Sequence, residues 1–362
     1  MRARSIVFAA LLAAPAGAAP FINNFHQNKT VSSTVPHNGD VNPYGVAVVP
    51  QTIGRLRAGH VLVSNFNNGQ NLQGTGTTIV QISPRGQFSV FAEIDASSLP
   101  GPCPGGVGLT TALVVLRSGW IIVGSLPTSD GMSATMQAGC LLILDSGGRV
   151  VKTLSGGAIN GPWDMTALEQ DDDDLTLLFV TNVLNGTVAA GGNVVNRGTV
   201  VRIALSVDYY GISERSRTVI GMGFGERTDP SALVVGPTGV GLAVDGTLYV
   251  ADSVSSRIVA IEGAVSRGHP TQGAVVSSGG ALNDPLGLAI APNGDILTTN
   301  GGDGNLVETT PDGHQVAVQA LDTTPAPPGL PGNGTLFGLA VVPDGSGVYF
   351  VDDGTNTLNL LH

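Results

Sequence analysis

The sequence has little charge, few aromatic side chains and almost no lysine. Charged residues fill 12% of the 362 positions, about half the share usual in globular domains, and aromatic residues fill 5%. Lysine occurs only at Lys29 and Lys152, and the formal net charge is −11. Because no basic stripe can neutralise phosphates, we expect no nucleic-acid partner. The acidic run Asp171–Asp174 is expected to be a solvated turn, with weak calcium binding as the alternative.

Long apolar runs are missing after the N-terminus, so we expect no membrane span. The first residues differ from the rest of the chain, because Arg2 and Arg4 precede an apolar run over 5–14 and Ala16-Gly17-Ala18 matches an A-x-A cleavage site. This order predicts a cleaved signal peptide over residues 1–19 and a secreted or periplasmic protein. The alternative is an ordinary buried N-terminal helix.

Cysteine is scarce too, with Cys103 and Cys140 standing 37 positions apart. In an oxidising compartment, a disulfide between them is the expected state. Two separate buried thiols are the alternative. Neither cysteine belongs to a C-x-x-C motif or is paired with a histidine in a pattern that would indicate a metal or redox role.

Glycine, by contrast, is abundant, with 52 residues beside 22 prolines and a large share of Val, Leu and Ile. This composition favours many short strands joined by tight turns, and it argues against a helical bundle, a coiled coil or a disordered chain. One pattern of strand, glycine-containing turn and second strand occurs three times. The three copies are Gly239–Asp252, Pro285–Asn300 and Thr335–Asp352.

Looser copies extend this repeat to six units, spaced by 46 to 77 residues. The shorter spacings match a four-stranded propeller blade. The sixth unit is one strand short, and the β-branched segment Thr30–Val35 can supply that strand. We therefore predict an all-β fold: a six-bladed β-propeller over 42–362, with four-stranded blades and a ring closed by the N-terminal segment 20–41. A free N-terminal tail is the alternative.

The fourth unit carries the repeat most fully, in Gly241–Val244, Leu248–Asp252 and Ser256–Ile258. These repeats resemble the NHL-repeat six-bladed β-propellers over residues 42–362, and related propellers look like gluconolactonases and streptogramin lyases. The resemblance implies a site at the channel mouth, where gluconolactonase-like members bind a divalent metal through an Asn or Asp just before the repeat glycine. At that place this chain has Tyr44, Thr111, Trp163, Val240, Leu286 and Phe337.

In such a fold, the first strands begin and the second strands end on one face, called the upper face below. Polar side chains from the second strands would converge there over an apolar floor from the first strands, as in a concave binding site. The alternatives are Asx side chains that only fix their own turns, and aromatic side chains that only plug the channel. The candidate ligand contacts are Tyr44, Asn65, Trp163, Asn182, Asp252, Asn300, Phe337 and Asp352.

Three long, nearly uncharged loops, 65–76, 125–139 and 182–198, are expected to rise from the upper face and suit neutral polar ligands. The sequence thus favours an exported, non-catalytic binding protein with a protein or neutral glycan partner, and it leans away from an enzyme. The alternative is a metal-assisted lyase or lactone hydrolase. A divalent ion at the channel mouth would then be held by some of Asn182, Asp252, Asn300 and Asp352, and no other cofactor is indicated.

Overall fold

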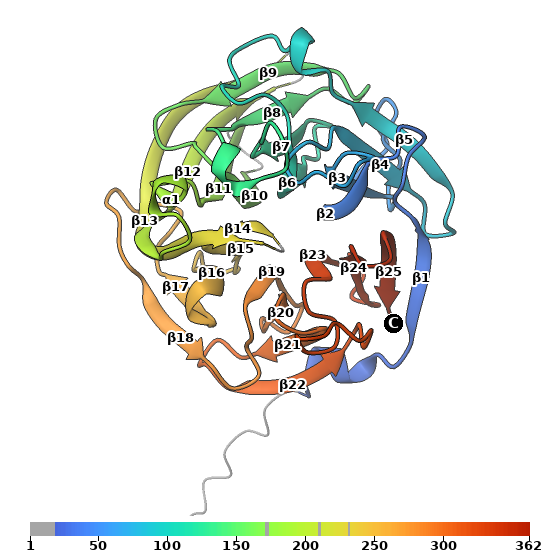
Figure 1. Ribbon diagram of the computed structural model, residues 1–362, viewed down its shortest axis with the longest axis vertical. Helices are drawn as coiled ribbons and strands as arrows, with labels where there is room; N and C mark the ends of the chain where they lie inside the picture. The colour runs from blue at the N-terminus through green and yellow to red at the C-terminus, as the bar shows by residue number, and fades with distance from the viewer. Residues whose placement is uncertain (1–18, 171–173, 209–210, 231) are drawn as a thin grey trace, which may run out of the picture.

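The computed structural model describes residues 19–170, 174–208, 211–230 and 232–362. The expected signal peptide, except Ala19, and Asp171–Asp173 of the acidic run lie outside this part. Six antiparallel sheets surround a central channel, which confirms the predicted six-bladed β-propeller (Figure 1). Among the described residues, no helix is long and apolar enough to cross a membrane.

The first three blades run outward from the channel in chain order. Blade one contains β2 (Val41–Val48), β3 (Val61–Asn67), β4 (Thr78–Ile82) and β5 (Phe88–Glu93). Blade two contains β6 (Leu109–Val115), β7 (Ile121–Ser125), β8 (Cys140–Leu144) and β9 (Val150–Ser155). Blade three contains β10 (Pro162–Gln170), β11 (Leu175–Asn182), β12 (Val195–Val207), β13 (Ile212–Asp229) and the short β14 (Leu233–Val235).

The last three blades have four strands each. Blade four contains β15 (Pro237–Leu242), β16 (Leu248–Asp252), β17 (Arg257–Ile261) and β18 (Ala274–Ser278). Blade five contains β19 (Pro285–Ile290), β20 (Ile296–Asn300), β21 (Asn305–Thr309) and β22 (Gln315–Ala320). Blade six contains β23 (Leu336–Val341), β24 (Val348–Asp352), β25 (Thr357–Leu361) and β1 (Asn28–Ser33). The helical turns are η1 (Phe21–Asn24), η2 (Ala96–Ser98), η3 (Ser133–Thr135), α1 (Thr187–Ala190) and η4 (Ser253–Ser255).

Tight turns explain why the repeat forms hairpins. Gly246, Gly294 and Gly345 occupy equivalent turns with φ of +83°, +90° and +74°, a left-handed conformation that glycine adopts without steric cost. In the turn of blade four, Asp245 accepts the backbone N–H of Thr247 at 2.9 Å. The Asp-Gly and Asn-Gly signals therefore predicted the innermost hairpins of the last three blades.

The N-terminal strand closes the ring, as predicted. Strand β1 pairs antiparallel with β25, from Asn28 opposite Leu361 to Ser33 opposite Thr357. Figure 1 shows the two strands side by side although they come from opposite ends of the chain. Before β1, Ile22 is fully buried within the apolar cluster between blades five and six. This closure pairs an edge that would otherwise stay open.

Blade three departs from the prediction. A four-stranded blade was expected, but β12 and β13 are much longer than the strands of the other blades, and β13 turns back into the fifth strand β14. Figure 1 places β14 near the centre of the ring, beside β15. The side chains of Leu233, Val234 and Val235 belong to the central apolar cluster. This extension has no counterpart in the other blades, so the repeat could not predict it.

The predicted disulfide is present between Cys103 and Cys140, with their Cα atoms 5.2 Å apart. Cys103 lies in the connection from blade one to blade two, and Cys140 begins β8 directly after the long loop of blade two. The bridge therefore joins an interblade connection to the base of an upper-face loop.

Candidate functional site

The floor of the channel mouth is a packed aromatic plug. The ring of Tyr44 stacks on Phe337 at a centroid distance of 3.9 Å and on Phe66 at 4.4 Å, and Trp163 lies 6.2 Å from Tyr44. All four side chains are at most 2% exposed. The indole Nε1 of Trp163 donates to the carbonyl of Val234 at 3.1 Å, which fixes β14 over the rings. Of the two interpretations left open for the apolar residues, the geometry matches the plug.

The five polar candidates at the second-strand ends are buried and bonded within their own surroundings. Asn65 donates to the Thr34 carbonyl at 3.0 Å, and Asn182 accepts from the Asn160 N–H at 3.2 Å. Asp252 accepts from Arg257 at 2.6 Å, Asn300 donates to the Ala281 carbonyl at 2.8 Å, and Asp352 accepts from the Thr355 N–H at 3.0 Å. These bonds anchor strand ends and turns. The ligand-binding role of the eight predicted residues stays a prediction, and none of them lines the pocket described next.

A polar pocket of about 610 Å³ opens on the upper face between blades one and six, and we call it the upper pocket. It is bounded by the start of β2, the loop after β3, the β13–β14 hairpin and the segments that flank β23 and β24. Most of its polar lining is carboxamide, with one carboxyl group. The lining side chains with polar ends are Asn42, Asn67, Asn71, Gln73, Asn333, Asp353 and Asn356.

Local backbone geometry fixes the carboxamides of the upper pocket. Asn42 adopts a left-handed φ of +66°, and its N–H donates to the side-chain oxygen of Asn356 at 2.7 Å. Asn67 donates to the Asn71 side chain at 2.7 Å, and the Asn67 Oδ1 atom is buried without a hydrogen-bond partner in the described structure. Gln73 donates to the Pro230 carbonyl at 2.9 Å, and its Oε1 atom is likewise unpartnered. Two buried acceptors beside the pocket are therefore without a hydrogen-bond partner in the described structure.

Asp353 supplies the single carboxyl group of the upper pocket. Its backbone N–H donates to the Thr335 carbonyl at 2.9 Å, and its side chain is partly exposed to the pocket. Burial, followed by repulsion from Asp352 and Asp322, raises the pKa of Asp353 well above its usual range. The group is therefore a protonated acid over a wider pH range than an ordinary aspartate.

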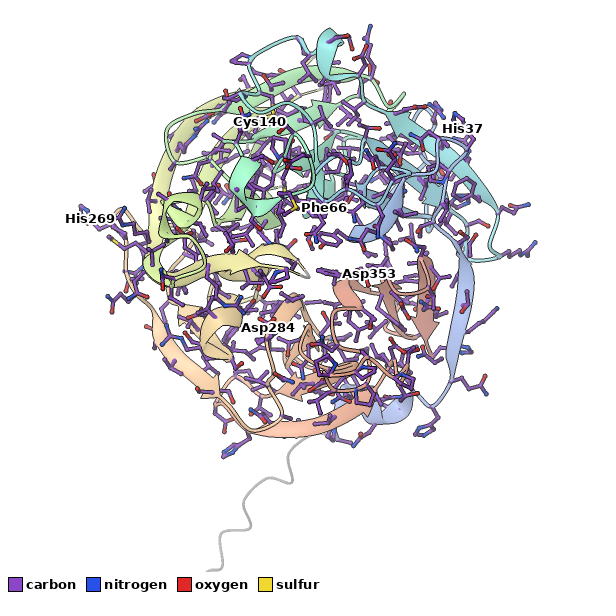
Figure 2. The ribbon with its side chains drawn as sticks, in the orientation of Figure 1. His37, Phe66, Cys140, His269, Asp284 and Asp353 are labelled. Carbon is purple, nitrogen blue, oxygen red and sulfur yellow. A yellow bond between two sulfur atoms is a disulfide. The ribbon has the colours of Figure 1, made fainter. Side chains whose placement is uncertain are left out.

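Two further titratable groups lie close to this part of the channel. Burial, and then the charges of Asp353 and Asp229, raises the pKa of the Tyr44 phenol, whose hydroxyl has no partner in the described structure. Burial, and then Asp229, raises the pKa of Asp284 to about 7. Figure 2 shows Asp284 and Asp353 on either side of the middle of the ring, with Phe66 across from them. The mouth is therefore rich in carboxyl groups that resist ionisation.

The residues do not fit the divalent metal site that the family resemblance implies. The positions just before the repeat glycines include the plug residues Tyr44, Trp163 and Phe337, which provide no carboxylate. Within the described ranges, no three His, Cys, Asp or Glu side chains converge to hold a metal ion. His37 and His269 lie at the periphery of the ring (Figure 2). We therefore derive no chemistry through a metal ion.

The three long loops rise from the upper face as predicted, but they pack into one cap with the β13–β14 hairpin. The Thr128 N–H donates to the Gly74 carbonyl at 2.9 Å, which joins the first two loops. Ser133 donates to the Leu233 carbonyl at 3.0 Å, and the Asn185 N–H donates to Glu226 at 2.8 Å. The loops thus brace the hairpin, and only the first contributes residues to the upper pocket.

Sequence reasoning missed the residues of the upper pocket by one or two positions. It selected Tyr44, Asn65 and Asp352, whereas Asn42, Asn67 and Asp353 line the pocket. The signal was present in the Asn-rich and Asp-rich strand ends. What the pattern could not show is which of two neighbouring Asx side chains bonds its own turn and which faces the ligand space.

No sequence family profile and no curated protein sequence matches this chain. Solved structures do share its fold. A gluconolactonase from Xanthomonas campestris has a TM-score of 0.54 and 14% identity over 92% of this chain and 88% of its own. Virginiamycin B lyase from Staphylococcus aureus has a TM-score of 0.51 and 14% identity over 92% and 98%. The calcium-binding protein regucalcin from Agrobacterium tumefaciens has a TM-score of 0.51 and 14% identity over 93% of both chains.

These likenesses show a fold shared with gluconolactonase-like and streptogramin-lyase-like propellers. The more specific NHL-repeat assignment stays a prediction. The neighbours include enzymes. They also include a calcium-binding protein. A shared fold does not by itself transfer an activity.

Proposed function

We propose that this protein is an enzyme that cleaves a carbon–oxygen bond in a small, neutral, hydroxyl-rich substrate bound in the upper pocket. A lactone hydrolase or a related lyase is the reaction class that we favour. The observation that carries the proposal is Asp353, the one carboxyl group in a pocket of carboxamides, whose raised pKa preserves its proton. The enzymes among the structural neighbours support the same class.

Both reactions release an oxygen that needs a proton, and a positioned acid can supply it. In lactone hydrolysis, the oxygen of a water molecule bonds to the carbonyl carbon and the ring carbon–oxygen bond breaks. The leaving oxygen takes the proton of Asp353, and the proton lost by the water restores the carboxyl group. The carboxamide side chains that line the pocket can exchange hydrogen bonds with substrate hydroxyls.

The experiment compares turnover and binding in Asp353→Asn, with glucono-δ-lactone as the trial substrate. Loss of a general acid lowers kcat by about 10²- to 10⁴-fold, and KM should change little because the carboxamides remain. Asp344→Asn is the matched control, since this exposed carboxyl group accepts the Ser346 N–H at 2.9 Å, does not line the pocket and does not contribute to the raised pKa of Asp353. A pH-stat assay, corrected for spontaneous opening, measures the rates.

Non-catalytic recognition of a neutral saccharide is the second candidate, favoured by the carboxamide lining of the upper pocket. Calorimetry with the lactone and its reduced polyol separates the two functions. Binding of both compounds without turnover in the unchanged protein would replace the enzyme with a binding protein. Equal kcat in Asp353→Asn and the unchanged protein would remove the assigned acid.

We further propose that the protein is exported, on the strength of the N-terminal charge, apolar run and A-x-A pattern. The disulfide is consistent with an oxidising compartment. Mass spectrometry of the protein recovered from its producing cells would test this. A new N-terminus near residue 19 or 20 is expected, and retention of Met1 to Ala18 in the cytosolic fraction would contradict export.

A further inference from the structure

A second cavity lies in the channel on the other side of the aromatic plug. It has a volume of about 330 Å³, and we call it the lower cavity. All six inner strands line it with their middle and later residues, among them Val46, Leu113, Met165, Leu242, Ile290 and Ala340. Leu242, Ile290 and Ala340 are partly exposed, so the cavity opens where the inner strands end. It is therefore separate from the upper pocket and independent of the function proposed there.

The wall of the lower cavity combines aliphatic side chains and glycine backbone with two threonines and one carboxyl group. Asp164 accepts the Met165 N–H through Oδ1 at 2.8 Å and the Val240 N–H through Oδ2 at 3.1 Å. Thr111 lines the same cavity, and its buried hydroxyl has no partner in the described structure. Three polar side chains, Thr111, Asp164 and Thr166, thus share a small chamber, and the carboxyl oxygens of Asp164 can accept further hydrogen bonds.

No counter-ion accompanies this carboxyl group. Asp164 lies on β10, and the strands packed against it, β6, β7, β11 and β15, contain no titratable side chain. On β10 itself, the other titratable side chain is Glu169 near the far end, which is paired with Arg117 at 3.5 Å. Among the residues that line the lower cavity, Asp164 is the only charged type.

We propose that the lower cavity binds a small organic ammonium ion, whose nitrogen pairs with Asp164 while its carbon body packs against the aliphatic side chains of the chamber. A buried carboxylate is stabilised by a directly bonded cation, and the chamber itself provides none. The net charge of −11 attracts cations to the molecule. Aliphatic side chains around a few convergent polar groups are typical of small-molecule sites.

The protonation state of Asp164 should make the binding of an ammonium ion depend on pH. Burial raises the pKa of Asp164 to about 8, against the opposing effect of its two N–H bonds. Pairing with a cation needs the ionised form, so binding releases a proton below pH 8. Affinity for an ammonium ion should therefore rise about tenfold per pH unit from pH 6 toward 8 and level off above it. A neutral ligand of the same shape should show no such rise.

The test is calorimetric titration of the full chain with cyclohexylammonium, and with cyclohexanol as its neutral match, from pH 6 to 9. We expect saturable amine binding that tightens with pH, and weaker cyclohexanol binding without that trend. Asp164→Asn should weaken amine binding at pH 8 by at least about tenfold, one pKa unit of interaction. Asp284→Asn is the control, because this carboxyl group also has a raised pKa but does not line the lower cavity.

A second variant keeps the test decisive if Asp164→Asn does not fold. Ala289→Leu fills space at the partly exposed end of the lower cavity and leaves Asp164 intact, so both compounds should bind more weakly. Three outcomes would each overturn the proposal. They are no amine binding at millimolar concentration at pH 8 to 9, equal amine affinity in Asp164→Asn or Ala289→Leu, and cyclohexanol affinity that matches the amine at every pH.

Discussion

At the scale of single residues, Glu308 shows how one buried side chain holds two ends of the fold together. Its carboxylate accepts the backbone N–H groups of Phe21 at 2.6 Å and Ile22 at 2.8 Å, and it also accepts from Asn293 at 3.0 Å. Glu308 is fully buried on β21, whereas Phe21 and Ile22 precede the closing strand β1. The residue therefore docks the N-terminal segment on blade five.

Glu308→Ala should lower the free energy of unfolding by about 2–6 kcal/mol, because it leaves two buried N–H groups unpaired at about 1–3 kcal/mol each. Denaturant melts measure the change. Glu308→Gln should lose less, since one oxygen can still accept. Glu93→Ala is the control: this carboxylate is half-exposed beside His37, and such pairs contribute at most about 1 kcal/mol. Equal losses in Glu308→Ala and Glu93→Ala would show that the docking contact is dispensable.

The elements of the fold differ in how well the sequence predicts them. Hairpins with Asp-Gly or Asn-Gly turns, such as β15–β16 and β19–β20, were predicted because local turn chemistry and strand periodicity agree. The closing strand β1 was predicted because the sixth unit is one strand short and the segment Thr30–Val35 can supply that strand. The β13–β14 hairpin was not predicted, because its pairing depends on burial over the plug and not on a repeated local pattern. The upper pocket depends on that hairpin through Pro230, so its boundary could not be predicted either.

At the same scale, the Cys103–Cys140 disulfide should stabilise the upper-face loop of blade two more than the blade itself. A closed loop of 37 residues corresponds to about 4 kcal/mol on the chain-entropy estimate. Hydrogen exchange before and after reduction measures the effect by segment. We expect faster exchange over 126–139, whereas the strand amides of β7 and β8 stay protected because the sheet ladder holds them.

The Cys103→Ser/Cys140→Ser double variant is the control for this experiment. Its loop should already exchange as fast as the reduced loop, and reductant should not change it further. Equal protection over 126–139 in oxidised and reduced protein would contradict the prediction. It would mean that contacts with the neighbouring loop, such as the bond from Thr128 to Gly74, hold the segment without the bridge.

At the scale of the whole molecule, burial raises the pKa of several carboxyl groups above the ordinary value. Burial is the first cause of a raised pKa in Asp164, to about 8, in Glu226 and Asp284, to about 7, and in Asp295, to about 6. The folded state therefore retains protons that the unfolded chain releases near its ordinary pKa of about 4. Stability contributed at low pH is lost as pH rises through these folded-state values. Burial lowers the pKa of His60, so this one group contributes stability that increases as the pH rises.

The melting temperature should accordingly fall from pH 5 to pH 8, with the loss from Asp164 extending to the top of that range because its pKa is about 8. Calorimetric melts in buffers of constant ionic strength test this. Asp164→Asn removes one of the titrating groups, so its melting temperature should fall less between pH 7 and 8 than that of the unchanged protein. Exposed carboxyl groups such as Asp344, whose pKa is lowered by its bonds to Ser346, have finished titrating below this range and do not mask the trend. A melting temperature that rises from pH 5 to 8 would mean that the buried carboxyl groups gain partners on ionisation, and an ammonium ligand at Asp164 is one partner that would produce such a rise.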